Sequence, residues 1–171
     1  DTTVPVTVDD IIYHTRNVSR GLQRAFLVAD MPFMSYSDPN QALENAVRLM
    51  QEGGAMMVKL EGGEDQIAIV EHLARHDIAV CAHLGLKPQS VHKIGGFRVQ
   101  GRDPKEASKI LDNAKALQDA GADTVLLECV PNELGKSIKE NLDVPVIGIG
   151  AGPFVDGQIL VLYDILDITQ G

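Results

Sequence analysis

The chain has 171 residues, of which 44% are hydrophobic, and this suits one globular domain with a sizeable core. Its 15 basic residues against 24 acidic ones give a formal net charge of −9, which disfavours nucleic acid and anionic membrane surfaces as partners. No apolar stretch approaches the roughly 20 residues that span a bilayer, and the first residues lack the pattern of a signal peptide, so we expect a cytoplasmic protein.

Helices and strands are predicted to alternate along the chain. Apolar residues at helical spacing, with capping or terminating residues beside them, predict five helices over about residues 9–21, 38–53, 65–75, 103–121 and 132–141. Short apolar runs between and after these helices predict six strands: AFLVAD, MMVKLE, IAVCAH, TVLLE, PVIGIG and ILVLYD. The connections are short, and no low-complexity linker divides the chain, so residues 1–171 are expected to form a single domain.

Five of the six predicted strands end on a polar or ionisable residue, and the sixth ends on glycine. The five are Asp30, Glu61, His83, Glu128 and Asp164. Near-continuous apolar strands indicate burial on both faces, as in a parallel sheet flanked by helices. A charge that is confined to the last residue of each strand indicates a functional rim shared by the strand ends.

Two folds suit alternating βα units, namely the doubly wound open sheet and the (β/α)8 barrel. Six strands fit the open sheet numerically. However, no G-x-G-x-x-G follows an early strand, and polar residues end nearly every strand, as expected where strand ends surround one site. We therefore favour the barrel.

Spacing indicates the chemistry of the rim. Lys59 and Glu61 are two residues apart on one strand, so their side chains point to the same side. Together with Asp30, Glu61 offers the hard oxygen ligands that Mg²⁺ prefers. Glu128 follows three apolar residues and is expected to be partly desolvated, which favours a general base. His83 is expected either as a substrate contact or as a structural histidine beneath the rim.

Other residues carry weaker expectations. Asp164 either belongs to the rim or caps the segment that follows. The glycines of GIGAG either cradle an anion or allow tight packing, and the arginines of GGFRVQGR lie either near an anionic substrate tail or in a solvated loop. Cys81 and Cys129 fall in predicted buried strands and are expected as reduced core thiols.

Seven blocks in order carry a resemblance to a known family. They are PVTVDDIIYHT, LVADMPF, VKLEGGE, AHLGLKPQS, GGFRVQGR, LLECVP and PVIGIGAG. With these blocks the chain resembles the ketopantoate (3-methyl-2-oxobutanoate) hydroxymethyltransferases over essentially its whole length. The resemblance implies a (β/α)8 barrel of the phosphoenolpyruvate/pyruvate type, a homo-oligomer that is decamer-like in the family, and a requirement for Mg²⁺. It also implies hydroxymethyl transfer from 5,10-methylenetetrahydrofolate to 3-methyl-2-oxobutanoate through a Mg-stabilised enolate, in pantothenate and coenzyme A biosynthesis.

The resemblance also implies a role for each candidate residue. Asp30 matches a metal ligand that also meets substrate, and Glu61 matches the second carboxylate of the metal site. Lys59 matches a substrate contact, His83 a pocket histidine, and Glu128 the proton acceptor. These implied roles agree with the expectations drawn from spacing.

The chain departs from the family pattern at both ends. Members usually carry two further strands before PVTVDD, the second ending in a G-D-S motif that binds metal and substrate. The 171 residues are therefore expected to hold about strands 3 to 8 of an incomplete barrel. Two alternatives stay open: another Mg-dependent 2-oxoacid enolate enzyme of the same superfamily, whose K-K-C-G-H-like run does not occur here, or a catalytically silent fragment that only self-associates.

Overall fold

The computed structural model of the chain describes residues 2–96 and 98–169. Its six strands are β1 (Val28–Asp30), β2 (Met57–Glu61), β3 (Val80–Gly85), β4 (Thr124–Glu128), β5 (Val146–Ile149) and β6 (Gly157–Gln158). Its α-helices are α1 (Val8–Gly21), α2 (Pro39–Gln51), α3 (Ile67–Ala74), α4 (Val91–Ile94), α5 (Pro104–Asp119), α6 (Asn132–Asn141) and α7 (Leu162–Ile165). Two short 3₁₀ helices, η1 (Glu64–Gln66) and η2 (Pro88–Ser90), follow β2 and β3.

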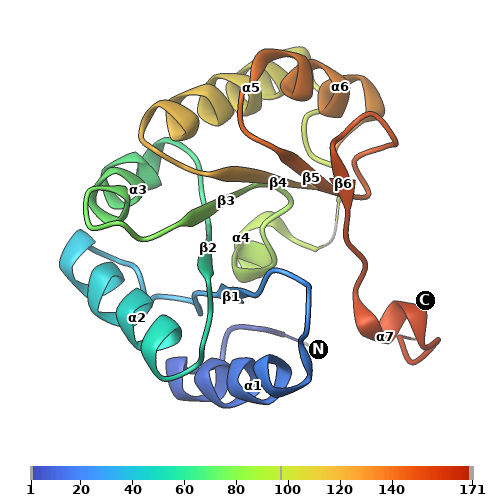
Figure 1. Ribbon diagram of the computed structural model, residues 1–171. Helices are drawn as coiled ribbons and strands as arrows, with labels where there is room; N and C mark the ends of the chain where they lie inside the picture. The colour runs from blue at the N-terminus through green and yellow to red at the C-terminus, as the bar shows by residue number, and fades with distance from the viewer. Residues whose placement is uncertain (1, 97, 170–171) are drawn as a thin grey trace.

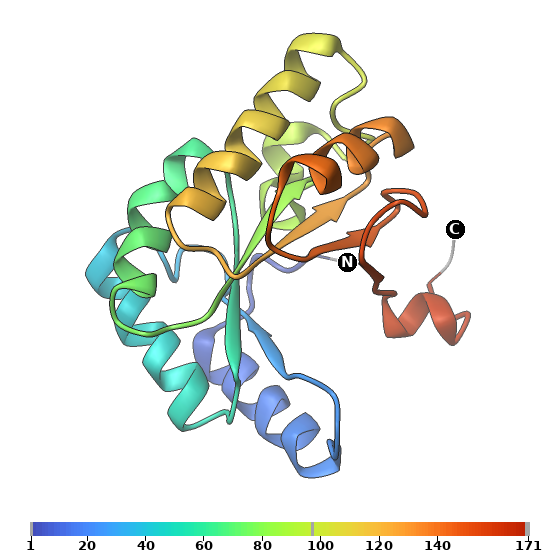
Figure 2. The same ribbon diagram turned by 45° about the horizontal axis from the view of Figure 1, so that its top comes forward.

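The strands form one parallel sheet in chain order, β1-β2-β3-β4-β5-β6. The sheet is curved, and α1, α2, α3, α5 and α6 lie along its outer, convex side (Figure 1). The short helices α4 and α7 lie on the other side, and the view in Figure 2 shows the strand ends gathered there. A doubly wound sheet would have a reversal in strand order and helices on both faces. Sequential order with helices outside is the arrangement of a partial (β/α) barrel.

Local sequence explains where the main helices begin. Thr7 and Asp10 form a capping box at α1, in which each side chain accepts a hydrogen bond from the other residue's backbone N–H. Asp38 and Asp103 are the N-caps of α2 and α5, and each side chain accepts hydrogen bonds from backbone N–H groups of the first turn. Each is followed directly by proline, which suits the first position of a helix. The helices predicted near residues 38 and 103 are therefore confirmed, and α1 begins slightly earlier than predicted.

Alternation along each strand divides the core in two. Residues such as Val58, Ala82 and Leu127 face outward and belong to the main hydrophobic core with the helices. Residues of opposite parity form a small second cluster of Met57, Cys81 and Leu126. This second cluster lies on the inner face, directly before the polar strand ends, and so provides the apolar floor beneath the candidate site.

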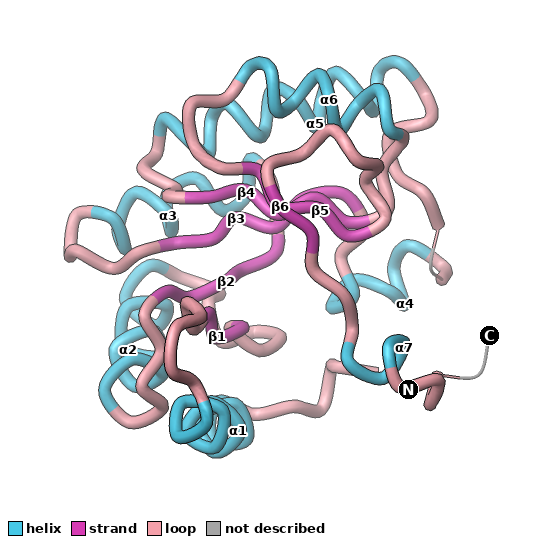
Figure 3. Tube along the Cα trace, turned by 45° about the vertical axis from the view of Figure 1, so that its right-hand side comes forward, coloured by secondary structure: helices cyan, strands magenta, loops and turns pink. Residues whose placement is uncertain are grey.

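Three details of the strand predictions were wrong. ILVLYD is not a strand, because β6 ends at Gln158 and Asp164 lies in α7. The chain leaves the sheet after Ile159 donates to the carbonyl of Gly148, and runs away from the sheet to α7 (Figure 3). Leu160, in this departing segment, is 70% exposed. β3 continues two residues beyond His83, and Cys129 lies after β4, half-buried, in a left-handed conformation (φ 50°).

Among the helices within residues 2–96 and 98–169, none combines the length and apolar character needed to cross a membrane.

Candidate active site

The candidate site lies at the carboxyl ends of four neighbouring strands. Asp30 of β1 is in register with Lys59 of β2, and Glu61 of β2 is in register with His83 of β3. Lys59 and Glu61 are two residues apart and so share a face, and Glu128 of β4 lies two residues beyond the register partner of His83. The register of the sheet therefore brings all five side chains to the same face.

These five side chains form a continuous series of contacts. Lys59 Nζ lies 3.2 Å from Asp30 Oδ2 and 3.4 Å from His83 Nδ1. His83 Nε2 lies 3.2 Å from Glu128 Oε2, and His83 Nδ1 lies 3.9 Å from Glu61 Oε1. The side chains of Lys59 and His83 are 13% and 2% exposed, so water screens these interactions weakly.

His83 connects Lys59 to Glu128. Burial lowers the pKa of His83, so the imidazole is neutral near neutral pH. Burial also opposes the charge of Lys59, but the carboxylates of Asp30 and Glu61 raise its pKa overall, so it is an ammonium group that can only donate. We therefore assign Nδ1 of His83 as the acceptor and place the proton on Nε2, facing Glu128. The approach of Nε2 to Glu128 is close but is not aligned as a regular hydrogen bond.

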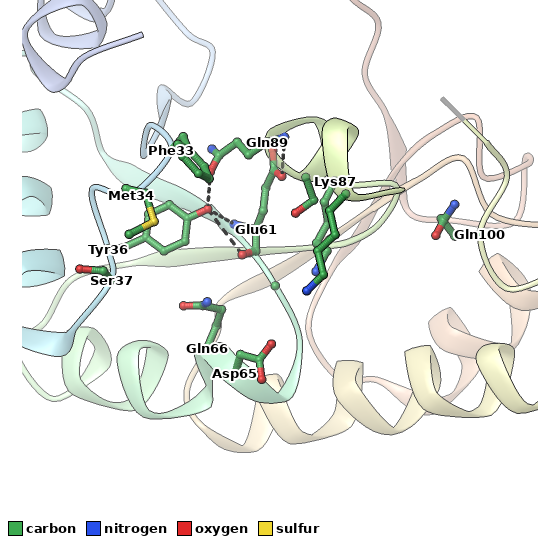
Figure 4. A pocket seen from close by; sticks show the side chains of 13 residues that line it. Phe33, Met34, Tyr36, Ser37, Glu61, Asp65, Gln66, Lys87, Gln89 and Gln100 are labelled. Atoms are coloured by element: carbon green, nitrogen blue, oxygen red, sulfur yellow. Dashed lines mark hydrogen bonds between the residues drawn. The ribbon is translucent and has the colours of Figure 1, made fainter. Parts of the chain in front are cut away.

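Glu61 is a buried carboxyl group held by two loops. Its side chain is 6% exposed, and burial raises its pKa to about 7, against the opposing effects of Lys59 and of the backbone N–H of Gln89. The Gln89 side chain accepts from Tyr36 Oη (2.6 Å) and donates to the carbonyl of Met31 (2.8 Å). Tyr36 Oη in turn accepts from the backbone N–H of Glu61 (Figure 4). Glu61 therefore changes protonation near neutral pH in a fixed position.

A close approach between β3 and β4 sets the position of Glu128. Gly85 has φ 88°, and a Cβ atom there would overlap the backbone carbonyl oxygen of Glu128. That carbonyl accepts a hydrogen bond from the N–H of Leu86 (2.8 Å). The Glu128 side chain is 18% exposed, which agrees with the partial burial expected from sequence.

The structure brings together every residue proposed for catalysis, substrate binding or metal binding, namely Asp30, Lys59, Glu61, His83 and Glu128. Asp164 does not join them, because it lies on the exposed helix α7. Arg98 and Arg102 are exposed, and Phe97 of the same loop lies outside the described residues. Of the glycines of GIGAG, Gly148 and Gly152 pack tightly, since a Cβ atom at either would overlap a neighbouring side chain, Val155 or Asn132.

Sequence reasoning missed Tyr36 and Gln89. Tyr36 lies in the loop after β1, and Gln89 lies in η2 after β3. Gln89 falls inside the block AHLGLKPQS and Tyr36 just after the block LVADMPF, and this closeness to the blocks that carry the family resemblance was the available signal.

The carboxylates present are compatible with a hard cation. Asp30 and Glu61 supply oxygen ligands, and the raised pKa of Glu61 reflects burial and, to a smaller extent, the neighbouring charges of Asp30 and Glu128. Within residues 2–96 and 98–169, no three His, Cys, Asp or Glu residues are arranged to hold a metal ion. The two carboxylates of Asp30 and Glu61 suit Mg²⁺, which usually keeps several water ligands and needs only one or two carboxylates from the protein.

Comparison with known proteins gives consistent results. A family model described as ketopantoate hydroxymethyltransferase matches residues 1–171. The chain is 61% identical to the 3-methyl-2-oxobutanoate hydroxymethyltransferase of Nitrosococcus oceani, covering 100% of this chain and 65% of that protein. It is 60% identical to the same-named protein of Halorhodospira halophila, covering 99% of this chain and 62% of that protein. The chain thus spans slightly less than two thirds of the length of these relatives.

Solved structures share the fold at low identity. A phosphonomutase-like protein of Burkholderia cenocepacia J2315 aligns with a TM-score of 0.72 at 15% identity, over 95% of this chain and 74% of that one. A phosphonopyruvate hydrolase aligns with a TM-score of 0.69 at 13% identity, over 96% of this chain and 63% of that one. These alignments show that the fold of this chain is shared with the two proteins, as a partial (β/α) barrel. By its match over all 171 residues and its close relatives, the chain belongs to the ketopantoate hydroxymethyltransferase family.

Proposed function

We propose that this chain carries the site at which a hydroxymethyl group passes from 5,10-methylenetetrahydrofolate to 3-methyl-2-oxobutanoate, giving 2-dehydropantoate for pantothenate biosynthesis. The family membership supports the reaction class, since the named relatives are hydroxymethyltransferases of that 2-oxoacid. The observation that carries the proposal is the connection from Asp30 through Lys59 and His83 to Glu128 at the strand ends. Such a connection links a fixed positive charge to a carboxylate able to accept a proton.

Each residue has a chemical task in this proposal. Glu128 takes the C3 proton of the 2-oxoacid, and the electron pair of the broken C–H bond forms the C2–C3 double bond of an enolate. Lys59 lies where its ammonium group stabilises the negative charge that develops. His83 lies between them, with Nδ1 3.4 Å from the Lys59 ammonium group and Nε2 3.2 Å from the Glu128 carboxylate. The one-carbon unit is bonded to two folate nitrogens. One C–N bond opens to an iminium ion, to which water adds its hydroxyl oxygen, and the enolate carbon then bonds to that carbon as the second C–N bond breaks. The two nitrogens take up one proton from water and the one that Glu128 had accepted.

Asp30 and Glu61 are the residues that would hold Mg²⁺ in this proposal. When bound, Mg²⁺ supplies a Lewis acid that withdraws electron density from the 2-oxo group and makes the C3 proton more acidic. Asp30 is half-exposed and has one oxygen paired with Lys59, which leaves its other oxygen accessible to a ligand. Glu61 is ionised more readily when a cation lies beside it, because an opposite charge lowers a raised carboxyl pKa.

The oligomer and the cytoplasmic location expected from the sequence are part of the same proposal. Residues 159–168 form an exposed apolar segment, and such a patch marks a contact surface either for a second copy or for further barrel elements, since the relatives are longer than this chain.

The direct test is exchange of the C3 proton of 3-methyl-2-oxobutanoate in D₂O, followed by proton NMR. We expect the chain to catalyse exchange with Mg²⁺ and to lose it in EDTA. 3,3-Dimethyl-2-oxobutanoate, which has no C3 proton, should inhibit competitively without exchanging. Product formation should require methylenetetrahydrofolate in addition. Absence of exchange, both in this chain and in one extended to the length of its relatives, would rule out the reaction class.

A further inference from the structure

Glu61 lies at the point where the regular pairing of β1 with β2 stops. The N–H of Met31 donates to the Lys59 carbonyl (2.8 Å), and in a continued parallel ladder the N–H of Glu61 would donate to the Met31 carbonyl. Instead, the Met31 carbonyl accepts from Gln89 Nε2 (2.8 Å), and the Glu61 N–H donates to Tyr36 Oη (3.3 Å). Two side chains from outside the sheet therefore replace one bond of the ladder.

These two side chains also contact each other, so the hydrogen bonds around Glu61 form a closed set. Tyr36 Oη donates to Gln89 Oε1 at 2.6 Å, and the backbone N–H of Gln89 donates to Glu61 Oε2 at 3.1 Å (Figure 4). Tyr36 belongs to the segment after β1, and Gln89 belongs to η2 after β3. Glu61 ends β2, the strand between them, so it is held from both sides.

We propose that Tyr36 and Gln89 are positioning residues that fix the Glu61 carboxylate for its cation, and that they act as one unit through the hydrogen bond they share. This inference rests on the proposed function, which assigns Asp30 and Glu61 to Mg²⁺. Neither Tyr36 nor Gln89 is assigned a contact with the cation or with the substrate. Both act through Glu61.

The arrangement occupies one oxygen of the Glu61 carboxylate and leaves the other. Oε2 accepts from the N–H of Gln89, whereas Oε1 faces the strand-end residues, 3.9 Å from His83 Nδ1. The side chain is 6% exposed, so water has little access to replace these contacts. A hydrogen bond to one oxygen of a carboxylate orients the group and leaves the second oxygen for a ligand. Oε1 is therefore the oxygen left for a ligand.

Fixing a carboxylate before its ligand arrives strengthens binding, because the entropy cost of immobilising the side chain has already been met. The segment that carries Tyr36 is itself anchored. Asn45 Nδ2 of α2 donates to the Ser35 carbonyl at 2.7 Å, and Ser35 Oγ donates to the Pro32 carbonyl at 2.8 Å. Tyr36 is also buried, at 7% exposed. Its hydroxyl is thus held in place by its own segment, and it can in turn hold Glu61.

The test measures cation binding and needs no turnover. Mn²⁺ takes the same oxygen ligands as Mg²⁺, and its free form is measured by electron paramagnetic resonance during a titration. Tyr36→Phe removes only the hydroxyl, and Gln89→Leu removes the polar side-chain atoms at a similar size. We expect each to weaken Mn²⁺ binding about tenfold, a usual effect of losing a group that orients a metal ligand. Tyr13→Phe and Gln51→Leu, at exposed positions of α1 and α2, are the matched controls and should change it by less than about twofold.

Two combined variants test the shared action. Tyr36→Phe together with Gln89→Leu should weaken binding by no more than about tenfold, because either change alone already breaks the shared hydrogen bond. In a Glu61→Gln chain, whose own Mn²⁺ binding is weaker, adding Tyr36→Phe should change the affinity by less than about twofold. A general loss of stability would weaken binding in that background as well, and chemical unfolding in EDTA measures such a loss directly.

The outcomes separate this inference from the proposed function. Unchanged Mn²⁺ affinity in the single variants, a loss of about 100-fold in the double variant, or an undiminished effect of Tyr36→Phe in the Glu61→Gln chain would each overturn the inference. The proposed function would stand in these cases if C3 proton exchange were observed. The expected affinity pattern without C3 exchange would support the inference and contradict the proposed reaction. Mn²⁺ binding that is absent both in this chain and in one extended to the length of its relatives would also overturn the inference.

Discussion

At Gly85 the backbones of β3 and β4 come so close that a side chain has no room. A Cβ atom would overlap the carbonyl oxygen of Glu128, and φ is 88°. We predict that Gly85→Ala lowers the free energy of unfolding by about 2–4 kcal/mol, since strain and a backbone clash add. Gly95→Ala is the control, because Gly95 also has positive φ (80°) but open space around it. In urea unfolding, Gly95→Ala should lower the free energy of unfolding by only about 1–2 kcal/mol. Equal losses in Gly85→Ala and Gly95→Ala would show that the clash with the Glu128 carbonyl is unimportant.

The raised pKa of Glu61 makes stability depend on pH in a defined direction. A carboxyl group with a folded pKa of about 7, against an ordinary value of 4.5, holds its proton more tightly in the folded state. Its contribution is therefore full below about pH 4.5 and is lost as pH rises through 7. Glutamine mimics the protonated acid. We predict that Glu61→Gln is more stable than the unaltered chain at pH 8, by up to about 3 kcal/mol, and equal to it at pH 4.

Chemical unfolding in EDTA across this pH range measures the effect, because no divalent cation then pairs with the carboxylates. Exposed Glu44→Gln is the control and should show no pH-dependent difference. His83 titrates in the opposite sense, since its lowered pKa costs stability at acid pH, so the difference between variants is the useful quantity. A variant that gains its advantage at pH 4 would contradict this account of Glu61.

The site residues that end a strand could be predicted from the sequence, because the ends of those strands could be predicted. Asp30, Glu61 and Glu128 each end a strand, as their apolar runs indicate. Tyr36 and Gln89 were not predictable, because their positions depend on how two loops fold against each other. The order of contacts, with His83 between Lys59 and Glu128, also depends on strand register, which a sequence pattern does not specify.

Among the helices, α5 depends on the clearest local signal. Asp103 accepts hydrogen bonds from the backbone N–H groups of Lys105 and Glu106, and Pro104 occupies the first turn. We predict that Asp103→Ala lowers the free energy of unfolding by about 1 kcal/mol, the usual value for a lost N-cap. Asp112→Ala, at an exposed mid-helix position, should change it by less than about 0.5 kcal/mol. Equal effects of the two substitutions in thermal or urea unfolding would exclude capping as the cause.

Prediction of helices succeeded where the capping residues lie next to the helix in sequence. Prediction of strands succeeded where a neighbouring strand is present to pair with. The cap at Asp38 and the glycines after α2 predicted that helix well. ILVLYD failed for a different reason: its composition suits a strand, but in the sheet of the described residues β6 ends at Gln158 and pairs with β5 on one side only. Without a partner on the other side among the described residues, Leu162 and Asp164 adopt the short helix α7. Strand propensity is thus conditional on a neighbour.

At the scale of the whole molecule, the sheet is an open arc, and the exposed apolar segment of residues 159–168 follows its last strand, β6. Each of β1 and β6 has one hydrogen-bonded neighbour in the sheet. Leu160 and Leu162 are 70% and 61% exposed. Unpaired strand edges and exposed apolar side chains both favour association. The barrel was favoured from the sequence because alternating elements left two folds and the polar strand ends selected between them. The exposure of this segment was not expected, because its apolar residues suited a buried strand.

We predict that the chain self-associates with rising concentration and that Leu160→Lys combined with Leu162→Lys reduces this association. Sedimentation velocity measures the effect, and circular dichroism checks that the fold is retained. Val99→Lys, at a moderately exposed position in a loop, is the control and should leave association unchanged. A monomer at all concentrations, or equal effects of both changes, would show that residues 159–168 do not mediate contact.

The measurement that tests the site most directly compares two carboxylates in one reaction. C3 proton exchange of 3-methyl-2-oxobutanoate is followed by NMR in D₂O at saturating Mg²⁺ for Glu128→Gln, Glu61→Gln and the exposed control Glu133→Gln. With Glu128 as the proton acceptor, Glu128→Gln should slow exchange at least about 100-fold, Glu61→Gln should mainly raise the Mg²⁺ requirement, and Glu133→Gln should behave like the unaltered chain. Undiminished exchange in Glu128→Gln, with exchange abolished in Glu61→Gln, would contradict the assignment and make Glu61 the base.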